Sequence, residues 1–176
     1  MNGLHRMFGA AILGAAALCT TGASAHSASD AYLTLIAEPV HGARNVVHAQ
    51  WDIALRDLDF VLALDADGDG NITWKELRDR QRDIARYVYP TLGAGSNHGA
   101  CTITPTAQKV VDHADGAYAA MLFDIACPGN ASTMLLDYRL FFAIDPSHRG
   151  IVVMRNGSRI ATSLLAPDHA SVRLTF

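Results

Sequence analysis

The sequence is short of charge, and above all of clustered positive charge. Only 18% of its 176 residues are charged, the formal net charge is −3, and Lys and Arg form no run. Surfaces that bind nucleic acid or anionic membranes concentrate positive charge, so we expect neither as the main partner. Half of the residues are apolar, which argues against intrinsic disorder. Past the N-terminus, no stretch approaches the roughly 20 apolar residues of a membrane-spanning helix.

Motifs of common hydrolases are also missing. The sequence contains neither a G-x-S-x-G elbow nor an H-E-x-x-H helix, which are signatures of serine hydrolases and zinc proteases. The segment Asp145–Gly150 holds Asp, Ser, His and Arg, but neighbours in sequence do not make a triad in space. We interpret it as an Asp-Pro turn in which Arg149 pairs with Asp145. Hydrolysis stays the weakest functional alternative.

The first 25 residues have the pattern of a signal peptide. Arg6 gives a positive start, an apolar stretch runs from Met7 to Leu18, and Ala23-Ser24-Ala25 supplies small residues for cleavage. Cleavage after Ala25 predicts a mature chain of 151 residues (176 − 25) that begins at His26. This predicts a periplasmic or secreted protein with no transmembrane segment of its own.

Cysteine is scarce, and its placement agrees with export. Cys19 falls in the predicted signal peptide, which leaves Cys101 and Cys127 as an even pair. In an oxidising compartment such a pair predicts one disulfide. The alternative, a two-cysteine metal site, lacks the close C-x-x-C spacing of zinc sites.

Most of the remaining chain has the composition of short β-strands. Turn signals such as Asp115-Gly116, Pro128-Gly129-Asn130 and Asp145-Pro146 separate them, and Asn156-Gly157 predicts a tight hairpin. Regular short strands of this kind predict an antiparallel, immunoglobulin-like β-sandwich. The predicted strands are Ala31–Ala37, Val46–Leu55, Ala100–Thr104, Gln108–His113, Ala117–Ala126, Thr133–Ile144, Gly150–Arg155, Ser158–Leu164 and Ser171–Phe176.

Residues 55–92 interrupt this pattern with helical periodicity. Apolar residues recur at helical spacing on both sides of an acidic loop, so we expect a helix–loop–helix inserted into a single domain that spans residues 26–176. The overall class is therefore α+β. The apolar residues expected to pack toward the sandwich are Leu58, Val61, Leu62, Trp74, Leu77, Ile84 and Val88.

The loop Asp65–Glu76 fits the pattern D-x-[DN]-x-[DN]-G-x5-E at every specified position. Ca²⁺ is a hard cation that takes six to eight oxygen ligands. The pattern predicts carboxylates at positions 1, 3, 5 and 12, a backbone carbonyl at position 7, and a water-linked side chain at position 9. The corresponding residues are Asp65, Asp67, Asp69, Glu76, Asn71 and Thr73.

This segment resembles an EF-hand over about 38 residues. EF-hands usually occur in pairs, and the sequence contains no second loop. A sensor needs a helix pair that opens and exposes a groove, so we expect a structural calcium site of weak affinity, on the order of 10⁻⁴–10⁻³ M as in extracellular modules.

A wider resemblance covers nearly the whole mature chain. The segments Ala25–Leu33, Trp51–Asp59 and Asp145–Gly150 resemble the exported N-terminal domain of HupE/UreJ-type proteins, a family described as nickel or cobalt permeases. This chain lacks the membrane helices that follow in that family. The resemblance implies an accessory role beside a membrane permease or another protein.

The histidines offer an alternative metal function. A mature N-terminal His26 would combine an amine and a ring nitrogen in one chelate, which suits Cu²⁺ or Ni²⁺. His48 or His148 is the candidate for one further imidazole. The main prediction is nevertheless an exported calcium-binding interaction domain, and the alternative is a periplasmic accessory for copper, nickel or cobalt centred on His26.

Overall fold

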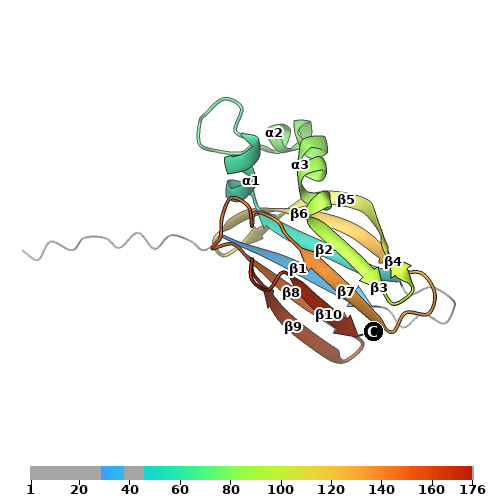
Figure 1. The fold of residues 1–176 in the computed structure, drawn as a ribbon. Helices are drawn as coiled ribbons and strands as arrows, with labels where there is room; N and C mark the ends of the chain where they lie inside the picture. Colours follow the sequence, from blue (N-terminus) through green and yellow to red (C-terminus); the bar gives the residue numbers. More distant parts are fainter. Residues whose placement is uncertain (1–28, 38–45, 176) are drawn as a thin grey trace, which may run out of the picture.

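A computed structural model describes residues 29–37 and 46–175 (Figure 1). These residues form a β-rich α+β fold with two sheets, and the three helices gather at one end of the sheets. The predicted signal peptide, His26 and Phe176 lie outside the described residues.

The larger sheet has six strands in the order β5-β6-β2-β1-β8-β9. Its strands are β1 (Asp30–Ala37), β2 (Val46–Ala54), β5 (Thr102–His113), β6 (Gly116–Ala126), β8 (Arg149–Asn156) and β9 (Arg159–Leu165). The smaller sheet has the order β10-β7-β3-β4. Its strands are β3 (Leu92–Ser96), β4 (Gly99–Ala100), β7 (Thr133–Tyr138) and β10 (Ser171–Thr175).

One strand pair contradicts the prediction of a purely antiparallel arrangement. Strand β1 pairs with β2 in antiparallel fashion on one side and with β8 in parallel on the other. The parallel pair brings Leu33 beside Val152, residues far apart in the sequence. Local turn signals describe hairpins between consecutive strands, and they carry no information about such a long-range partner.

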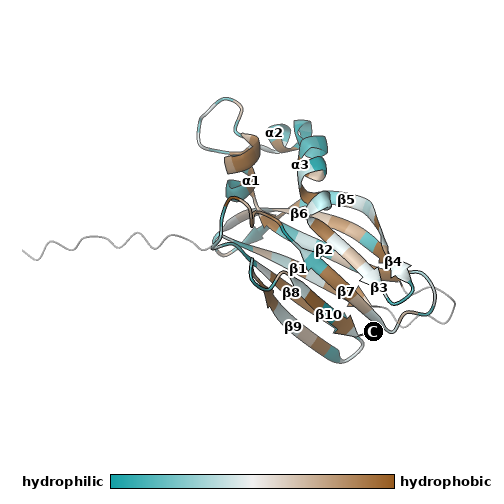
Figure 2. Cartoon of the chain, viewed as in Figure 1, coloured by the Kyte–Doolittle hydropathy of each residue, from teal (hydrophilic) through white to brown (hydrophobic). Residues whose placement is uncertain are grey.

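The strands bury alternate residues, as a pleated sheet requires. In β1, Leu33 and Leu35 are fully buried, and in β2, Trp51 and Ile53 are fully buried. Figure 2 shows the same alternation as brown and pale bands along the strands. Most buried apolar residues of both sheets belong to one hydrophobic core.

Trp51 and Tyr138 join the two sheets at the centre of this core. Their ring centroids lie 5.4 Å apart, with Trp51 on β2 and Tyr138 on β7. A Cβ at Gly150 would stand 2.8 Å from Cζ of Tyr138. Position 150 must therefore be glycine for β8 to approach this ring so closely.

The predicted helical segment is confirmed, but it contains more helices than expected. Helix α1 covers Leu55–Leu62, α2 covers Trp74–Asp79, and α3 covers Gln81–Val88, followed by the 3-10 turn η1 (Tyr89–Thr91). The second predicted helix is thus divided at Arg80, whose φ of −101° and ψ of 6° depart from helical values.

Some predicted strand boundaries are wrong. The predicted strand Thr133–Ile144 ends at Tyr138, because the chain turns and Phe141 takes a φ of 59°. Ala100–Thr104 and Gln108–His113 merge largely into one strand, β5, with a register shift between Pro105 and Ala107. Strand β3 was not predicted, because glycines are typical of turns and β3 contains two of them.

The predicted hairpin after β8 is confirmed, one residue later than expected. Asn156 pairs with Arg159, so the two turn residues are Gly157 and Ser158. Gly157 supplies a φ of 57°, which a glycine adopts without steric cost.

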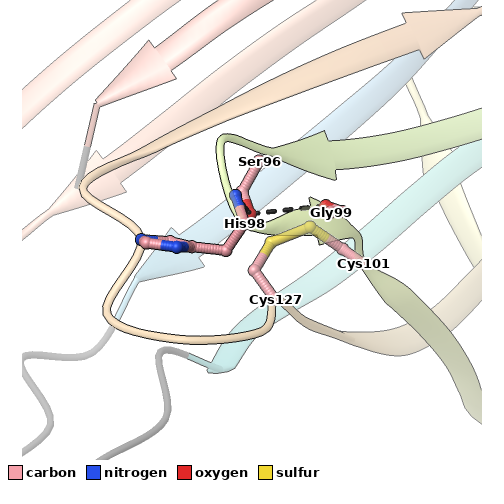
Figure 3. The surroundings of a disulfide bond; sticks show 5 residues. All are labelled: Ser96, His98, Gly99, Cys101 and Cys127. Atoms are coloured by element: carbon pink, nitrogen blue, oxygen red, sulfur yellow. Dashed lines mark hydrogen bonds between the residues drawn. A yellow bond between two sulfur atoms is a disulfide. The ribbon is translucent and has the colours of Figure 1, made fainter.

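The predicted disulfide between Cys101 and Cys127 is present (Figure 3). Cys101 lies between β4 and β5, and Cys127 follows β6, so the bond connects the two sheets at the end away from the helices. Next to it the β3–β4 turn is held by His98, whose backbone N–H donates to Ser96 Oγ at 3.1 Å. Ser96 Oγ in turn donates to the Gly99 carbonyl at 3.3 Å.

Candidate metal centre

The acidic loop lies between α1 and α2 and forms a closed turn of the chain (Figure 1). Helix α2 begins at Trp74, the tenth position of the loop, so Glu76 falls in its first turn. Helix α1 ends at Leu62, and Ala63 takes a left-handed conformation with a φ of 49°. Asp65, the first carboxylate of the loop, therefore lies three residues after the last residue of α1.

Three of the four predicted carboxylates converge. Oxygen atoms of Asp65, Asp67 and Glu76 all lie within 4.8 Å of one another, and this group could hold a metal ion. Within residues 29–37 and 46–175 it is the one such group of three. The structure does not bring Asp69 into it, since Asp69 Oδ1 instead accepts from the backbone N–H of Asn71 at 2.7 Å.

Asp65 organises the first half of the loop. Its two oxygens accept from the backbone N–H groups of Gly68 and Gly70, each at 2.8 Å. Both glycines have positive φ, 72° and 84°, a conformation that costs other residues roughly 1–2 kcal/mol. The glycine specified at the sixth position is thus used for its backbone freedom.

Glu76 closes the second half. One oxygen accepts from the Ala66 N–H at 2.8 Å, and the other accepts from the N–H of Thr73 at 2.8 Å and its hydroxyl at 2.7 Å. Thr73 Oγ1 accepts in return from the Glu76 N–H, which completes a capping box at the start of α2. The hydrogen bonds from Thr73 and Ala66 lower the pKa of Glu76 to about 2, so the carboxylate is anionic throughout the physiological range.

Thr73 and Asn71 occupy the predicted ninth and seventh positions. The Thr73 side chain caps α2, and the Asn71 side chain donates weakly to the Asp69 carbonyl at 3.4 Å. The Asn71 carbonyl stands at the position where calcium loops offer a backbone oxygen.

Two residues outside the loop pattern hold the segment that connects α1 to the acidic loop. The sequence analysis identified neither of them. Asp59 Oδ1 accepts from the N–H groups of Leu64 and Asp65 at 2.6 and 2.9 Å. Arg80 donates to the carbonyls of Leu62 and Ala63 at 2.7 and 3.0 Å. Arg80 thereby connects the end of α2 to the end of α1. The only sequence signal was an acidic residue in the last turn of α1.

The helices hold the loop on the core much as predicted. Leu58, Leu77, Ile84 and Val88 are at most 1% exposed, and Val61 and Leu62 pack partly buried against the core. The prediction for Trp74 is wrong, because its side chain is 51% exposed. Leu77, three residues further along α2, turns inward as predicted.

The loop also faces the larger sheet. A cavity of about 280 Å³ separates Gly70–Ile72 from the β5–β6 turn at Asp115–Ala117. Ile72, at the eighth loop position, packs partly buried against the core. The acidic loop therefore contacts the hydrophobic core through its own apolar residue.

His48 and His148, the two candidates for the further imidazole beside His26, lie far apart. His48 lies on β2 opposite Ile36, and its Nδ1 is 2.7 Å from Asp124 Oδ1. His148 immediately precedes Arg149, which pairs with Asp30 at the other end of β1. Six strand residues at about 3.3 Å each place these histidines roughly 20 Å apart. His26 lies outside the described residues.

His148 belongs instead to a buried hydrogen-bonded chain. It is 0% exposed, with Nδ1 2.7 Å from Ser29 Oγ and Nε2 2.7 Å from the Tyr138 hydroxyl. Ser29 Oγ donates to Asp57 Oδ2 at 2.9 Å. Because the single Ser29 proton goes to Asp57, the neutral imidazole donates from Nδ1 and accepts from Tyr138 at Nε2. Burial lowers the pKa of His148 to about 4, which agrees with this neutral state.

The expected Arg149–Asp145 pair does not form. Arg149 donates to the carbonyls of Pro146 and His148, at 3.0 and 2.8 Å. Asp145 Oδ1 accepts from the N–H and hydroxyl of Ser147. The predicted turn exists, but the Arg149 guanidinium donates to backbone carbonyls and not to the Asp145 carboxylate.

Comparison with protein-family models gives no match, and comparison with curated proteins gives none either. Among the described residues, no helix is long and apolar enough to cross a membrane.

Proposed function

We propose that this protein is an exported calcium-binding protein whose single EF-hand is a structural site in an interaction or accessory domain. The observation that carries the proposal is the convergence of Asp65, Asp67 and Glu76 within a loop whose twelve residues match the calcium pattern. Carboxylate and carbonyl oxygens are the ligands that Ca²⁺ prefers.

The carboxylates of Asp65, Asp67, Asp69 and Glu76 would hold the ion, together with the Asn71 carbonyl and a water linked to Thr73. The converging carboxylates of Asp65, Asp67 and Glu76 repel one another, and a divalent cation removes that repulsion. Magnesium is a weaker competitor because it demands tight octahedral geometry and keeps its waters. Asp69 would have to exchange its bond to the Asn71 N–H for the ion.

A structural role is supported by how the loop is attached. Arg80 and Asp59 fix its entry, and Leu77 and Ile84 anchor the following helices in the core. A calcium sensor opens such a helix pair, whereas here the buried residues of the helices are part of the core shared by both sheets. We infer that calcium binding orders the loop without opening this helical unit.

We further propose that the two sheets form an immunoglobulin-like β-sandwich that carries the EF-hand as an insertion. The contact of Trp51 with Tyr138 across the core supports this arrangement. Export is supported by the signal-peptide pattern and is compatible with the disulfide. An accessory role beside a metal permease rests on the resemblance to HupE/UreJ-type N-terminal domains.

The test is isothermal titration of Ca²⁺ into the full chain after treatment with EDTA. We expect one site per chain, with a dissociation constant on the order of 10⁻⁴–10⁻³ M. Glu76→Gln keeps the shape of the side chain but removes its charge, and it should abolish measurable binding. Asp79→Asn is the matched control, because Asp79 lies on the same helix and pairs with Lys75 at 2.6 Å. Binding that survives in Glu76→Gln would contradict the assigned ligands.

The copper, nickel or cobalt alternative is tested with the same titration. An added N-terminal residue masks the amine of His26, and the alternative requires that this masking weaken binding of Cu²⁺ or Ni²⁺. Unchanged affinity after masking would contradict it.

A further inference from the structure

A second cavity, of about 500 Å³, lies beside α1. It is lined by Ser29, Arg56, Asp57, Phe60, Phe141, Ile144 and Asp145. Its size falls within the usual range of small-molecule sites. The walls come from the start of β1, from α1 and from the turn after β7, three segments that meet only in the folded chain.

The charged groups of this cavity favour a cation. Two carboxylates, Asp57 and Asp145, face one guanidinium, that of Arg56. Arg56 is shared between two carboxylates, since its Nη2 lies 3.1 Å from Asp115 and its Nε lies 3.6 Å from Asp57. Asp57 is only 18% exposed, and burial raises its pKa. Hydrogen bonds from Ser147 lower the pKa of Asp145, so this carboxylate remains ionised.

The remaining wall is unusually apolar for a solvent-facing surface. Phe60 is 83% exposed and Ile144 is 49% exposed, and both line the same cavity. Exposed apolar residues that gather around a hollow mark binding sites more often than residues scattered singly. The exposed aromatic ring of Phe60 also offers a face to which a cation is attracted.

The backbone of the third wall is strained. Phe141 has a φ of 59°, which is an outlier for a bulky side chain. Its carbonyl accepts from the N–H groups of Ile144 and Asp145 at 2.9 and 2.8 Å. The strained turn therefore fixes one apolar and one acidic residue on the same wall. Strain of this kind is concentrated at ligand-binding and active sites.

We propose that this cavity binds a small organic cation, an ammonium group carried on an apolar or aromatic body. The ammonium lies between Asp57 and Asp145, and the body covers Phe60, Phe141 and Ile144. The site is separate from the acidic loop and does not depend on calcium.

The test follows the isoleucine methyl signals of the full chain by NMR during titration with phenethylamine, which is protonated at neutral pH. We expect the Ile144 methyl to shift in a saturable way. Ile160 on β9 is 60% exposed and does not line this cavity, so its signal should stay in place. The neutral analogue 2-phenylethanol should bind about tenfold more weakly, a difference of about 1.4 kcal/mol, and phenylacetate should not bind.

Asp145→Asn and Phe60→Ala should each weaken phenethylamine binding at least about threefold. Phe60 is so exposed that its removal does not endanger the fold. Asp124→Asn is the matched control, because Asp124 lies at the far end of β6 beside His48, and it should leave binding unchanged. The proposal is overturned if 2-phenylethanol or phenylacetate binds as well as phenethylamine. It is equally overturned if Ile160 shifts together with Ile144, or if no probe binds.

Discussion

Glu76 and Ala66 close the acidic loop: the Glu76 carboxylate accepts from the Ala66 backbone N–H at 2.8 Å, across ten residues of chain. The same carboxylate caps α2 through Thr73. A single side chain thus connects the beginning of the loop with the first turn of the exit helix. Glu76 stands at the position where the pattern expects a bidentate calcium ligand. Each of its two oxygens accepts a hydrogen bond from a backbone N–H, which fixes the orientation of the carboxylate.

Gly70→Ala should destabilise the loop through the backbone alone. Gly70 has a φ of 84°, and a Cβ there would meet nothing within 4 Å. The substitution should therefore lower the free energy of unfolding in Ca²⁺ by about 1 kcal/mol, measured by urea denaturation. Gly93→Ala is the control, because its Cβ would make an ordinary contact with Asp137 at 3.5 Å and its φ is not positive. Equal losses in both variants would contradict this role of Gly70.

Removal of the disulfide by the double substitution Cys101→Ala and Cys127→Ala should cost stability mainly through the unfolded chain. The bond closes a loop of 26 residues, and the chain-entropy model gives roughly 3 kcal/mol for a loop of this size. Urea denaturation of the oxidised protein and of the double variant measures the difference. A loss well below about 1 kcal/mol would show that the bond does not restrain the unfolded state as argued.

Stability should fall as the pH is lowered through the range in which His148 titrates. The pKa of His148 is about 4 in the folded protein, against an ordinary value of 6.5. Between these values the unfolded chain binds a proton that the folded chain does not, so unfolding becomes easier as the pH falls. The complete window corresponds to roughly 3 kcal/mol.

Urea denaturation at about pH 7 and about pH 5 measures this dependence while most carboxylates remain ionised. His148→Gln should flatten it, because the side chain no longer titrates. An equal pH dependence in the variant would assign the effect to other groups.

Export predicts a defined N-terminus. Expression of the full sequence in a bacterial host should give a protein in the periplasm whose mass corresponds to residues 26–176, with Cys101 and Cys127 oxidised. Intact-mass spectrometry measures both properties. Retention of Met1, or cleavage at a different residue, would contradict the predicted signal peptide and remove the basis for a chelating His26.

The sequence predicted what depends on local chemistry. Gly70 has the positive φ that a sharp turn at the sixth position requires, and Asp65 and Glu76 lie in one acidic cluster. Their role as calcium ligands stays a prediction. The hairpin at Gly157 follows in the same way from the preference of glycine for tight turns. The Cys101–Cys127 disulfide follows from the presence of two cysteines in the predicted mature chain. These features are encoded within short segments or by scarce residue types.

Features that depend on distant partners were not predictable. Ser29 and His148 are separated by 119 residues, and no periodicity links them. The parallel pairing of β1 with β8 depends on a strand far away in the sequence. Arg80, where the second predicted helix divides, hydrogen-bonds to Leu62 at the end of α1, a partner that helical periodicity does not indicate. Trp74 and Leu77 were both expected inside because both are apolar, yet α2 directs Leu77 to the core and leaves Trp74 exposed.

The most direct test of a structural calcium site is a thermal melt of the disulfide-bonded protein in EDTA and across a Ca²⁺ titration. A ligand that binds only the folded state stabilises it by RT ln(1 + [L]/Kd), so the melting temperature should rise steadily with Ca²⁺, and Glu76→Gln should not respond. An unchanged melting temperature up to about 10 mM Ca²⁺, well above the usual extracellular affinity range, would contradict the account.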